Sequence, residues 1–467
     1  MKQQIKNWIY VFSLIISVNF NVFAQNIEKT LSYIDFYGLI LKNHPVVKLA
    51  NLEIDYAQTE LLQAKGQFDP KLISGFDRKA INGDDYYNRW VTDLKIPVWG
   101  GIDVKLGNER NTGKYLRRDE SDILNFAGFS VPIGRGMLLD TRRNTLQQTK
   151  IYQNIAKAEQ QKMINKIIFS AAKDYWEWYL AYQNFLLQKE GLDLAKNRFE
   201  LLVQRAKIGE VAAVDSVEAK ITYQDRQVGY QQAAVDYINT TVIVSNYLWN
   251  NQEQPLMIPE GVIPQTVIST SIEPEILENL RQQAQKNHPE IAKLNFKFDQ
   301  LKIEERFRRE MLKPQLDLSY SVASSPKYGL ENYSIIRSNH KIGVDFEMPL
   351  LLRKERGKLQ QVKIKQLQTD LDRRQLSREI MNEVNIAYNE AVYLMQQLTT
   401  QQDAVKNQEI LLKAEQNKFA IGESSLFLIN SRESKLIDMR LKVEALKSKY
   451  QKAMASMAFA AGLSELP

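Results

Sequence analysis

Two short stretches decide the fold of this chain: residues 314–322, PQLDLSYSV, and residues 341–348, KIGVDFEM. In both, apolar side chains alternate with polar or charged ones, which is the pattern of a β-strand with one apolar and one polar face. Each stretch is long enough to cross an outer membrane. A sheet in lipid must close on itself, because each unpaired backbone group at an open edge costs several kcal/mol. The two stretches therefore predict part of a transmembrane β-barrel.

The first half of the chain carries a weaker pair of such strands, near residues 72–76 and 124–131. A further alternating run covers residues 90–108 and is interrupted by Trp99-Gly100-Gly101. This run is compatible either with a hairpin in the barrel or with a surface loop. Without it the chain has about four strands, which cannot close a barrel alone. The sequence therefore predicts an oligomer in which each copy supplies an arc of the wall.

The order of landmarks repeats along the chain. Asn43-His44-Pro45 recurs as Asn287-His288-Pro289, and Pro70-Lys71-Leu72 recurs as Pro314-Gln315-Leu316. Both recurrences are 244 residues apart (289 minus 45, and 314 minus 70). Two more pairs follow in the same order, Val131-Pro132 with Met348-Pro349 and Ile208-Gly209-Glu210 with Ile421-Gly422-Glu423. An internal tandem repeat explains this order.

The repeat sets a domain plan. Residues 1–24 have a basic start, an apolar run and a small-residue cleavage site, which are typical of a secretory signal peptide. Residues 25–249 form the first repeat, residues 250–274 a Pro- and Gly-containing linker, and residues 275–467 the second repeat. The expected elements are strands at about 71–134, a long helix at 141–206, a tip at 207–211, helices at 212–249 and 275–311, strands at about 314–349, a long helix at 356–420, a tip at 421–425 and a helix at 426–463.

The two long helices have coiled-coil spacing. Neither contains proline, and apolar residues recur at intervals of four and three. About 65 residues at a rise of 1.5 Å give roughly 100 Å of helix, far more than a compact domain needs. The seam of the second helix consists of Ile380, Val384, Ala387, Ala391, Leu394 and Leu398.

Composition argues against other classes of protein. The net charge is +7, but the basic residues are scattered along helices without interleaved aromatic residues, so nucleic acid is not an expected partner. There is no cysteine, which excludes disulfides and a lipidated N-terminal cysteine. The three histidines and dispersed methionines indicate no metal site. We find no catalytic motif and expect neither an enzyme nor a cofactor.

The duplicated order of strands, long helix and Gly-containing tip resembles the TolC-like outer membrane efflux protein family, over about residues 30–463. The resemblance implies an α+β membrane protein: a homotrimer whose 12-stranded transmembrane β-barrel, about four strands per protomer, continues into a long periplasmic α-helical coiled-coil barrel. It implies an exit duct in the outer membrane of a Gram-negative bacterium that carries small molecules or drugs. The alternatives are the duct of type I protein secretion and, on the helices alone, a periplasmic coiled-coil binding protein without a pore.

The resemblance also implies partners and sites. The partners are a periplasmic membrane-fusion adaptor protein, an inner-membrane pump of the RND or ABC type, and outer-membrane lipid. The expected adaptor contacts are the two tips, Ile208, Gly209, Glu210, Ile421, Gly422 and Glu423. The candidate periplasmic gate consists of Asp215, Glu218, Phe419, Ser424, Leu428 and Ser431. This set of residues differs from the family pattern, in which acidic residues and a Tyr/Arg clasp often close the tunnel.

Overall fold

The structure is a computed structural model that describes residues 30–112, 121–266, 272–326 and 338–464. The expected signal peptide lies outside these residues. The chain forms two compact units, and each unit takes segments from both halves of the sequence. The first unit consists of residues 1–44, 170–271 and 392–452, and the second of residues 45–169, 272–391 and 453–467. The tandem repeat and its boundaries remain predictions.

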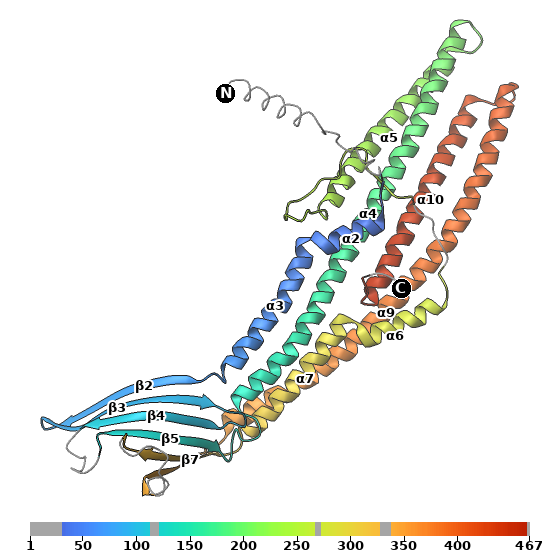
Figure 1. Ribbon diagram of the computed structural model, residues 1–467. Helices are drawn as coiled ribbons and strands as arrows, with labels where there is room; N and C mark the ends of the chain where they lie inside the picture. Colours follow the sequence, from blue (N-terminus) through green and yellow to red (C-terminus); the bar gives the residue numbers. More distant parts are fainter. Residues whose placement is uncertain (1–29, 113–120, 267–271, 327–337, 465–467) are drawn as a thin grey trace, which may run out of the picture. The chain divides into compact units, whose positions relative to one another are not determined.

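The second unit contains an open sheet of six strands, in which every neighbouring pair is antiparallel (Figure 1). Strand β5 pairs with β7, so strands from the two halves of the sequence meet in one sheet. In spatial order the strands are β2 (Lys71–Ile81), β3 (Asp84–Pro97), β4 (Asp103–Thr112), β5 (Ile123–Pro132), β7 (Gln315–Ser324) and β8 (His340–Glu347).

The sheet has six strands, two more than the four or so expected per protomer. The alternating run within residues 90–108 forms a hairpin, β3 and β4, which lies inside the sheet between β2 and β5. Gly100 and Gly101 at its turn have φ of 92° and 78°, a left-handed conformation that favours glycine. The sequence pattern alone could not separate a hairpin from a loop, because pairing with β2 and β5 decides between them.

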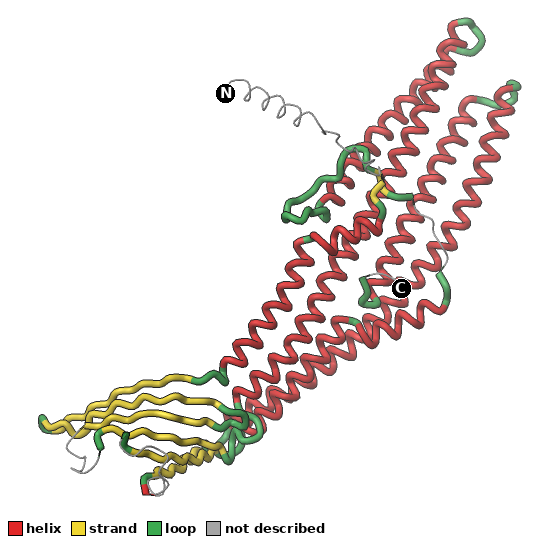
Figure 2. The backbone as a smooth tube through the Cα atoms, viewed as in Figure 1, coloured by secondary structure: helices red, strands yellow, loops and turns green. Residues whose placement is uncertain are grey.

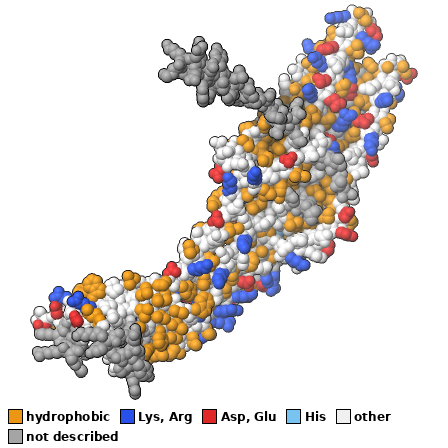
Figure 3. Space-filling model, in the orientation of Figure 1, with side chains coloured by type: hydrophobic (Ala, Val, Ile, Leu, Met, Phe, Trp, Pro, Cys, Tyr) orange, Lys and Arg blue, Asp and Glu red, His pale blue; other side chains and the backbone are white. Residues whose placement is uncertain are grey.

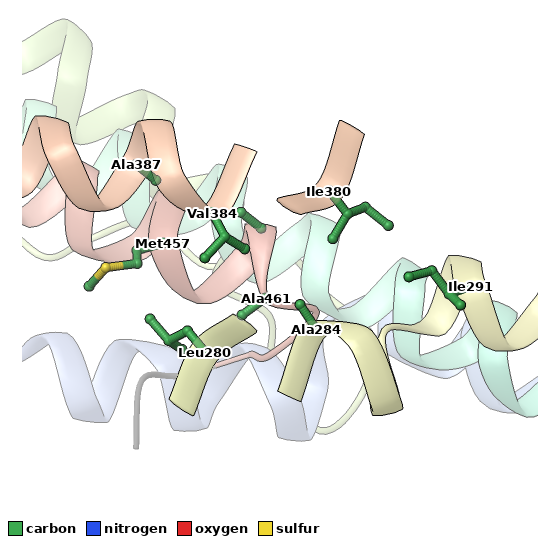
Figure 4. Close-up of a cluster of buried hydrophobic side chains, with 9 residues drawn as sticks. Leu280, Ala284, Ile291, Ile380, Val384, Ala387, Met457 and Ala461 are labelled. Carbon is green, nitrogen blue, oxygen red and sulfur yellow. The ribbon is translucent and has the colours of Figure 1, made fainter. Parts of the chain in front are cut away.

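Helices α3, α4, α7 and α9 adjoin the sheet in the second unit, where Figure 2 shows helix and strand meeting. Residues of α6 and α9 and the end of α10 form a core in which Leu280, Val384 and Met457 are fully buried (Figure 4). Every residue of the predicted seam, from Ile380 to Leu398, is buried. The bounds are α3 (Pro45–Gly66), α4 (Thr141–Lys207), α6 (Glu275–Asn287), α7 (Pro289–Glu310), α9 (Arg353–Ala420) and α10 (Leu426–Ala460).

The first unit contains two helical hairpins and a short parallel strand pair. The later part of α4 turns into α5 (Ala213–Ser245), and the later part of α9 turns into α10. Helix α2 (Tyr33–Asn43) follows β1 (Thr30–Leu31), which pairs with β6 (Ile263–Pro264).

An aromatic core holds the first unit together beside β1. The buried Tyr175 ring stacks on Phe36 with centroids 5.4 Å apart, and its hydroxyl donates to the carbonyl oxygen of Leu31 at 2.8 Å. Trp178, also buried, donates from its indole nitrogen to the Thr241 hydroxyl at 2.8 Å. These polar atoms are paired, as burial requires. Among the described residues, no helix is both long and apolar enough to cross a membrane.

Candidate functional site

The six strands share one apolar face. The register aligns side chains in rows that cross the sheet, and two adjacent rows are almost entirely apolar. Several of these side chains are exposed: Leu72 is 75% exposed and Ile342 62%. Figure 3 shows apolar side chains gathered over the part of the sheet that adjoins the helices. A patch of this kind marks a surface that meets another protein or lipid. One row is Leu72, Leu94, Leu106, Ala127 and Val322, and the other is Ile96, Val104, Phe129, Tyr320 and Ile342.

The opposite face of the same strands is polar and charged. One row of it contains Lys71, Lys95, Lys105 and Lys341, separated only by Gly128 and Ser321. Lys95 forms an ion pair with Asp103, with Nζ 2.9 Å from Oδ2. The alternation of apolar and charged side chains is that of a transmembrane barrel wall, with lipid outside and water inside.

Both edges of the sheet are open. Within the described residues, no strand pairs with the outer edge of β2 or of β8. Because the sheet has an even number of antiparallel strands, β2 and β8 run in opposite directions, so β8 of one copy can pair antiparallel with β2 of another. In lipid such an edge must be paired.

The turn of the β3–β4 hairpin is fastened to the start of α4. Arg142 of α4 lies between two carboxylates, with Nη1 2.8 Å from Asp103 Oδ1 and Nε 3.1 Å from Asp140 Oδ2. The ring of Trp99 in the turn stacks on Phe68, with centroids 5.8 Å apart. The turn of the hairpin therefore lies at the same end of the sheet as the helices.

Asp140 also caps α4. Its Oδ1 accepts from the backbone N–H of Arg143 at 3.0 Å and from the Arg143 Nε at 2.8 Å. Burial raises the pKa of Asp140, but the hydrogen bonds from Arg143 and Arg142 outweigh burial and hold it below its ordinary value. The charged form therefore persists at neutral pH.

The two Ile-Gly-Glu tips have the same backbone structure. In the first, the N–H of Gly209 donates to Ala206 O and that of Glu210 to Arg205 O. In the second, the N–H of Gly422 donates to Phe419 O and that of Glu423 to Lys418 O. This is the Schellman pattern, which ends a helix with a glycine of positive φ. Gly209 has φ of 75° and Gly422 of 83°.

Both tips present an exposed isoleucine. Ile208 is 77% exposed and Ile421 71%. The tips also share a hydrophobic cluster, which contains Leu202, Ala219 and Leu426 and is flanked by Phe199, Val211 and Phe419.

The candidate gate residues have different surroundings. Phe419 packs against the cluster between the tips. Asp215 lies in the first turn of α5, where the helix dipole favours a negative charge. The Ser424 hydroxyl donates to Glu415 Oε1. Leu428 is 41% exposed. The remaining two, Glu218 and Ser431, are half-buried and exposed respectively. Their role as a gate stays a prediction.

Three arginines of the helical hairpins form contacts that the sequence pattern did not identify. Arg198 of α4 donates to Asn430 Oδ1 at 2.7 Å and forms an ion pair with Glu433, both in α10. These partners lie more than 230 residues from Arg198, so no local pattern signals them. The other two are Arg226 of α5, which donates to the Ser434 hydroxyl at 2.7 Å, and Arg440 of α10, which pairs with Glu190 and Glu409. Helix α10 is thereby linked to α4, α5 and α9.

The repeated His-Pro pairs have structural contacts. His288 caps α7, because its Nδ1 accepts from the N–H of Glu290 at 3.3 Å. His44 is buried near the rings of Tyr247 and Trp249. Burial lowers the pKa of both histidines. In the part of the chain that the structure describes, no group of three or more His, Cys, Asp or Glu side chains could hold a metal ion.

Solved structures share this fold over most of the chain. The outer membrane channel CmeC of Campylobacter jejuni has a TM-score of 0.64 at 16% identity, covering 92% of this chain and 85% of its own. The outer membrane protein VceC of Vibrio cholerae has a TM-score of 0.65 at 14% identity, covering 92% and 96%. The open state of the MtrE outer membrane channel of Neisseria gonorrhoeae has a TM-score of 0.66 at 12% identity, covering 92% and 89%.

At the sequence level, no curated protein matches the chain. Residues 280–463 match the family model described as outer membrane efflux protein. This range includes β7, β8, α9, the second tip and α10. The resemblance to the TolC-like outer membrane efflux protein family is therefore confirmed, by this family match in the second half and by an outer-membrane channel fold across the described chain.

Proposed function

We propose that this protein is the outer-membrane exit duct of a tripartite efflux system, and that three copies join their sheets into one barrel. The observation that carries the proposal is the open sheet with one exposed apolar face, one charged face and two unpaired edges. A sheet of this kind is unstable alone in lipid and becomes stable when copies pair at β2 and β8. A closed barrel with a charged interior is a water-filled conduit.

The helices would extend this conduit into the periplasm. Helices α4 and α9 contain 67 and 68 residues. The tips would meet the membrane-fusion adaptor through the exposed side chains of Ile208 and Ile421, which flank the two Schellman glycines. The adaptor would couple the duct to an inner-membrane pump of the RND or ABC type, and the cargo would be small molecules or drugs.

Reconstitution tests the proposal. The purified mature protein is added to planar lipid bilayers, and its copy number is measured in parallel by native mass spectrometry. We expect a trimer that conducts ions in discrete steps. A monomer that inserts without conductance would overturn the proposal. To separate a closed gate from a missing pore, the measurement is repeated with Phe419→Ser and Leu428→Ser together, which removes two apolar candidate gate residues.

A further inference from the structure

We propose that the β3–β4 hairpin (residues 84–112) is part of the membrane wall, so that three copies of six strands close a barrel of 18 strands. This inference rests on the proposed function, because it concerns the barrel that the trimer would form. It departs from the 12-stranded barrel that the family resemblance implies.

The position of the hairpin in the sheet is the first argument. Strand β2 pairs with β3 along its whole length, from Lys71 to Ile81, and β5 pairs with β4. Strand β2 therefore joins the sheet only through the hairpin. If β3 and β4 lay outside the wall as a surface loop, β2 would lose its partner within the copy.

The two faces of the hairpin are the second argument. Strand β3 has 14 residues and β4 has 10, against about 9–11 needed for a transmembrane strand. Leu94 and Leu106 lie in the same apolar row as Leu72 and Val322. On the other face, Lys95 and Lys105 continue the polar row that contains Lys71. The hairpin thus has an apolar face and a polar face, and both are in register with the corresponding faces of the neighbouring strands.

The anchoring of the hairpin is the third argument. Its turn lies at the helical end of the sheet, where Asp103 pairs with Arg142 and Trp99 stacks on Phe68. The β2–β3 turn at Asn82-Gly83 lies at the other end. The hairpin therefore runs the full height of the sheet. An external loop would stay at the end remote from the helices.

A wider opening follows from the added strands. The diameter of a barrel grows roughly linearly with strand number, so 18 strands give a barrel about 1.5 times as wide as 12 strands, and barrels of 16–18 strands leave an aqueous channel. We infer that the outer-membrane section admits hydrophilic cargo of a cross-section that a 12-stranded barrel would exclude. The lysine row at the polar face would line this section.

Cysteine accessibility tests whether the hairpin is in the wall, and the absence of native cysteine makes each introduced thiol unique. Single variants Leu94→Cys and Leu106→Cys probe the apolar face, and Lys95→Cys and Lys105→Cys the polar face of the hairpin. The reference pair is Val344→Cys and Lys341→Cys in β8. Each variant is reconstituted in liposomes and treated with a water-soluble maleimide added on both sides of the membrane.

The proposal predicts labelling at positions 95, 105 and 341 and protection at positions 94, 106 and 344. If position 344 is protected but 94 and 106 are labelled as fast as 95, the hairpin is outside the wall and this inference is wrong, while the proposed function stands. If position 344 is also labelled, β8 is not in lipid and both proposals are overturned.

The strand number has a separate test. Native mass spectrometry of the wild-type protein from lipid nanodiscs counts the copies, and polymer-exclusion measurements in planar bilayers size the outer opening. Three copies, together with entry of polymers that a 12-stranded barrel of the same tilt excludes, support 18 strands. Two copies would give 12 strands and overturn the wider opening.

Discussion

The rings of Phe76 in β2 and Trp90 in β3 lie directly opposite each other, with centroids 5.8 Å apart. The Trp90 indole N–H donates to the Ser74 hydroxyl at 2.9 Å, and that hydroxyl lies 2.9 Å from the Thr92 hydroxyl. The polar groups of Trp90, Ser74 and Thr92 therefore satisfy one another, as a lipid-facing surface requires. The pair fastens the hairpin to β2 about halfway along the two strands.

Trp90→Ala removes the ring contact and one hydrogen bond. We expect the free energy of unfolding in bilayers to fall by about 1 kcal/mol, since a cross-strand aromatic pair contributes up to about that much. Urea titration followed by the mobility of the folded barrel on gels measures the change. Tyr87→Ala, on the polar face of the same strand, is the control and should change stability less. An equal loss of stability in both variants would show that the Phe76–Trp90 contact adds no stability of its own.

A charge on the apolar face should be much more harmful than one on the polar face. Val344→Arg in β8 places a guanidinium where we expect lipid, at a cost of about 2–4 kcal/mol near the middle of a bilayer. Asp345→Arg puts the same side chain on the other face of the same strand. We expect only the first variant to reduce the yield of folded oligomer in liposomes. Equal yields would contradict the assignment of the two faces.

The tip glycines should be needed for their conformation and not for space. An added Cβ at Gly209 or Gly422 meets no atom within 4 Å, but φ is positive at both. Each Gly→Ala change should therefore destabilise the tip by about 1–2 kcal/mol. The control is Gly357→Ala inside α9, where a Cβ also meets no atom within 4 Å and alanine is favoured by about 1 kcal/mol. In thermal unfolding we expect the two tip variants to lower the melting temperature and Gly357→Ala to raise it. A higher melting temperature for a tip variant would refute the strain argument.

Loss of the Arg198 contacts should loosen the tip. Arg198→Ala breaks the hydrogen bond to Asn430 and leaves the Glu433 carboxylate, whose side chain is 12% exposed, without this arginine. We expect higher single-channel conductance and faster hydrogen exchange at the start of α10. Arg205→Ala, which breaks the exposed pair with Glu210, is the control. An unchanged conductance with slower exchange would count against a restraining role for Arg198.

Acid should destabilise the second unit through His288. Burial has the largest effect and lowers the pKa of His288; Glu290 raises it and Lys162 lowers it, each by less. The folded state thus prefers the neutral ring, and its stabilising contribution is present above the ordinary pKa of about 6.5 and is lost as pH falls through the lower folded pKa. His288→Asn keeps a helix cap but cannot titrate. Denaturant unfolding at pH 7.5 and pH 5 should show a smaller pH dependence in the variant, and an equal dependence would exclude His288 as its source.

Local patterns predicted the elements of the fold but not all of their pairings. The alternation at residues 314–322 and 341–348 predicted two strands, observed as β7 and β8, because one face of each differs from the other in polarity. The spacing of Val384 and its neighbours predicted a buried seam, which the structure confirms. The hairpin around Trp99 stayed ambiguous, because its alternation fits a wall strand and an exposed loop equally well.

The candidate site was only partly predictable for a related reason. The Ile-Gly-Glu tips were recognisable, since a Schellman turn needs glycine at one position. The contacts of Arg198 with Asn430 and Glu433 join helices that are far apart in sequence, and single arginines on a charged helix give no sign of a partner. The lysine row of Lys71 and Lys105 depends on the register of strands, which one sequence cannot specify.

The most direct test of the account is a disulfide between β2 of one copy and β8 of the next. Cysteine replaces Gly75 in β2 and, in separate double variants, Lys341, Gly343 or Asp345 in β8, all on the polar face. Opposed residues of antiparallel strands lie within the 4.4–6.8 Å between Cα atoms that a disulfide spans. The account predicts oxidation of the reconstituted protein to a covalent trimer in at least one of these variants. Covalent dimers as the largest species, or no cross-link at any of the three positions, would contradict it.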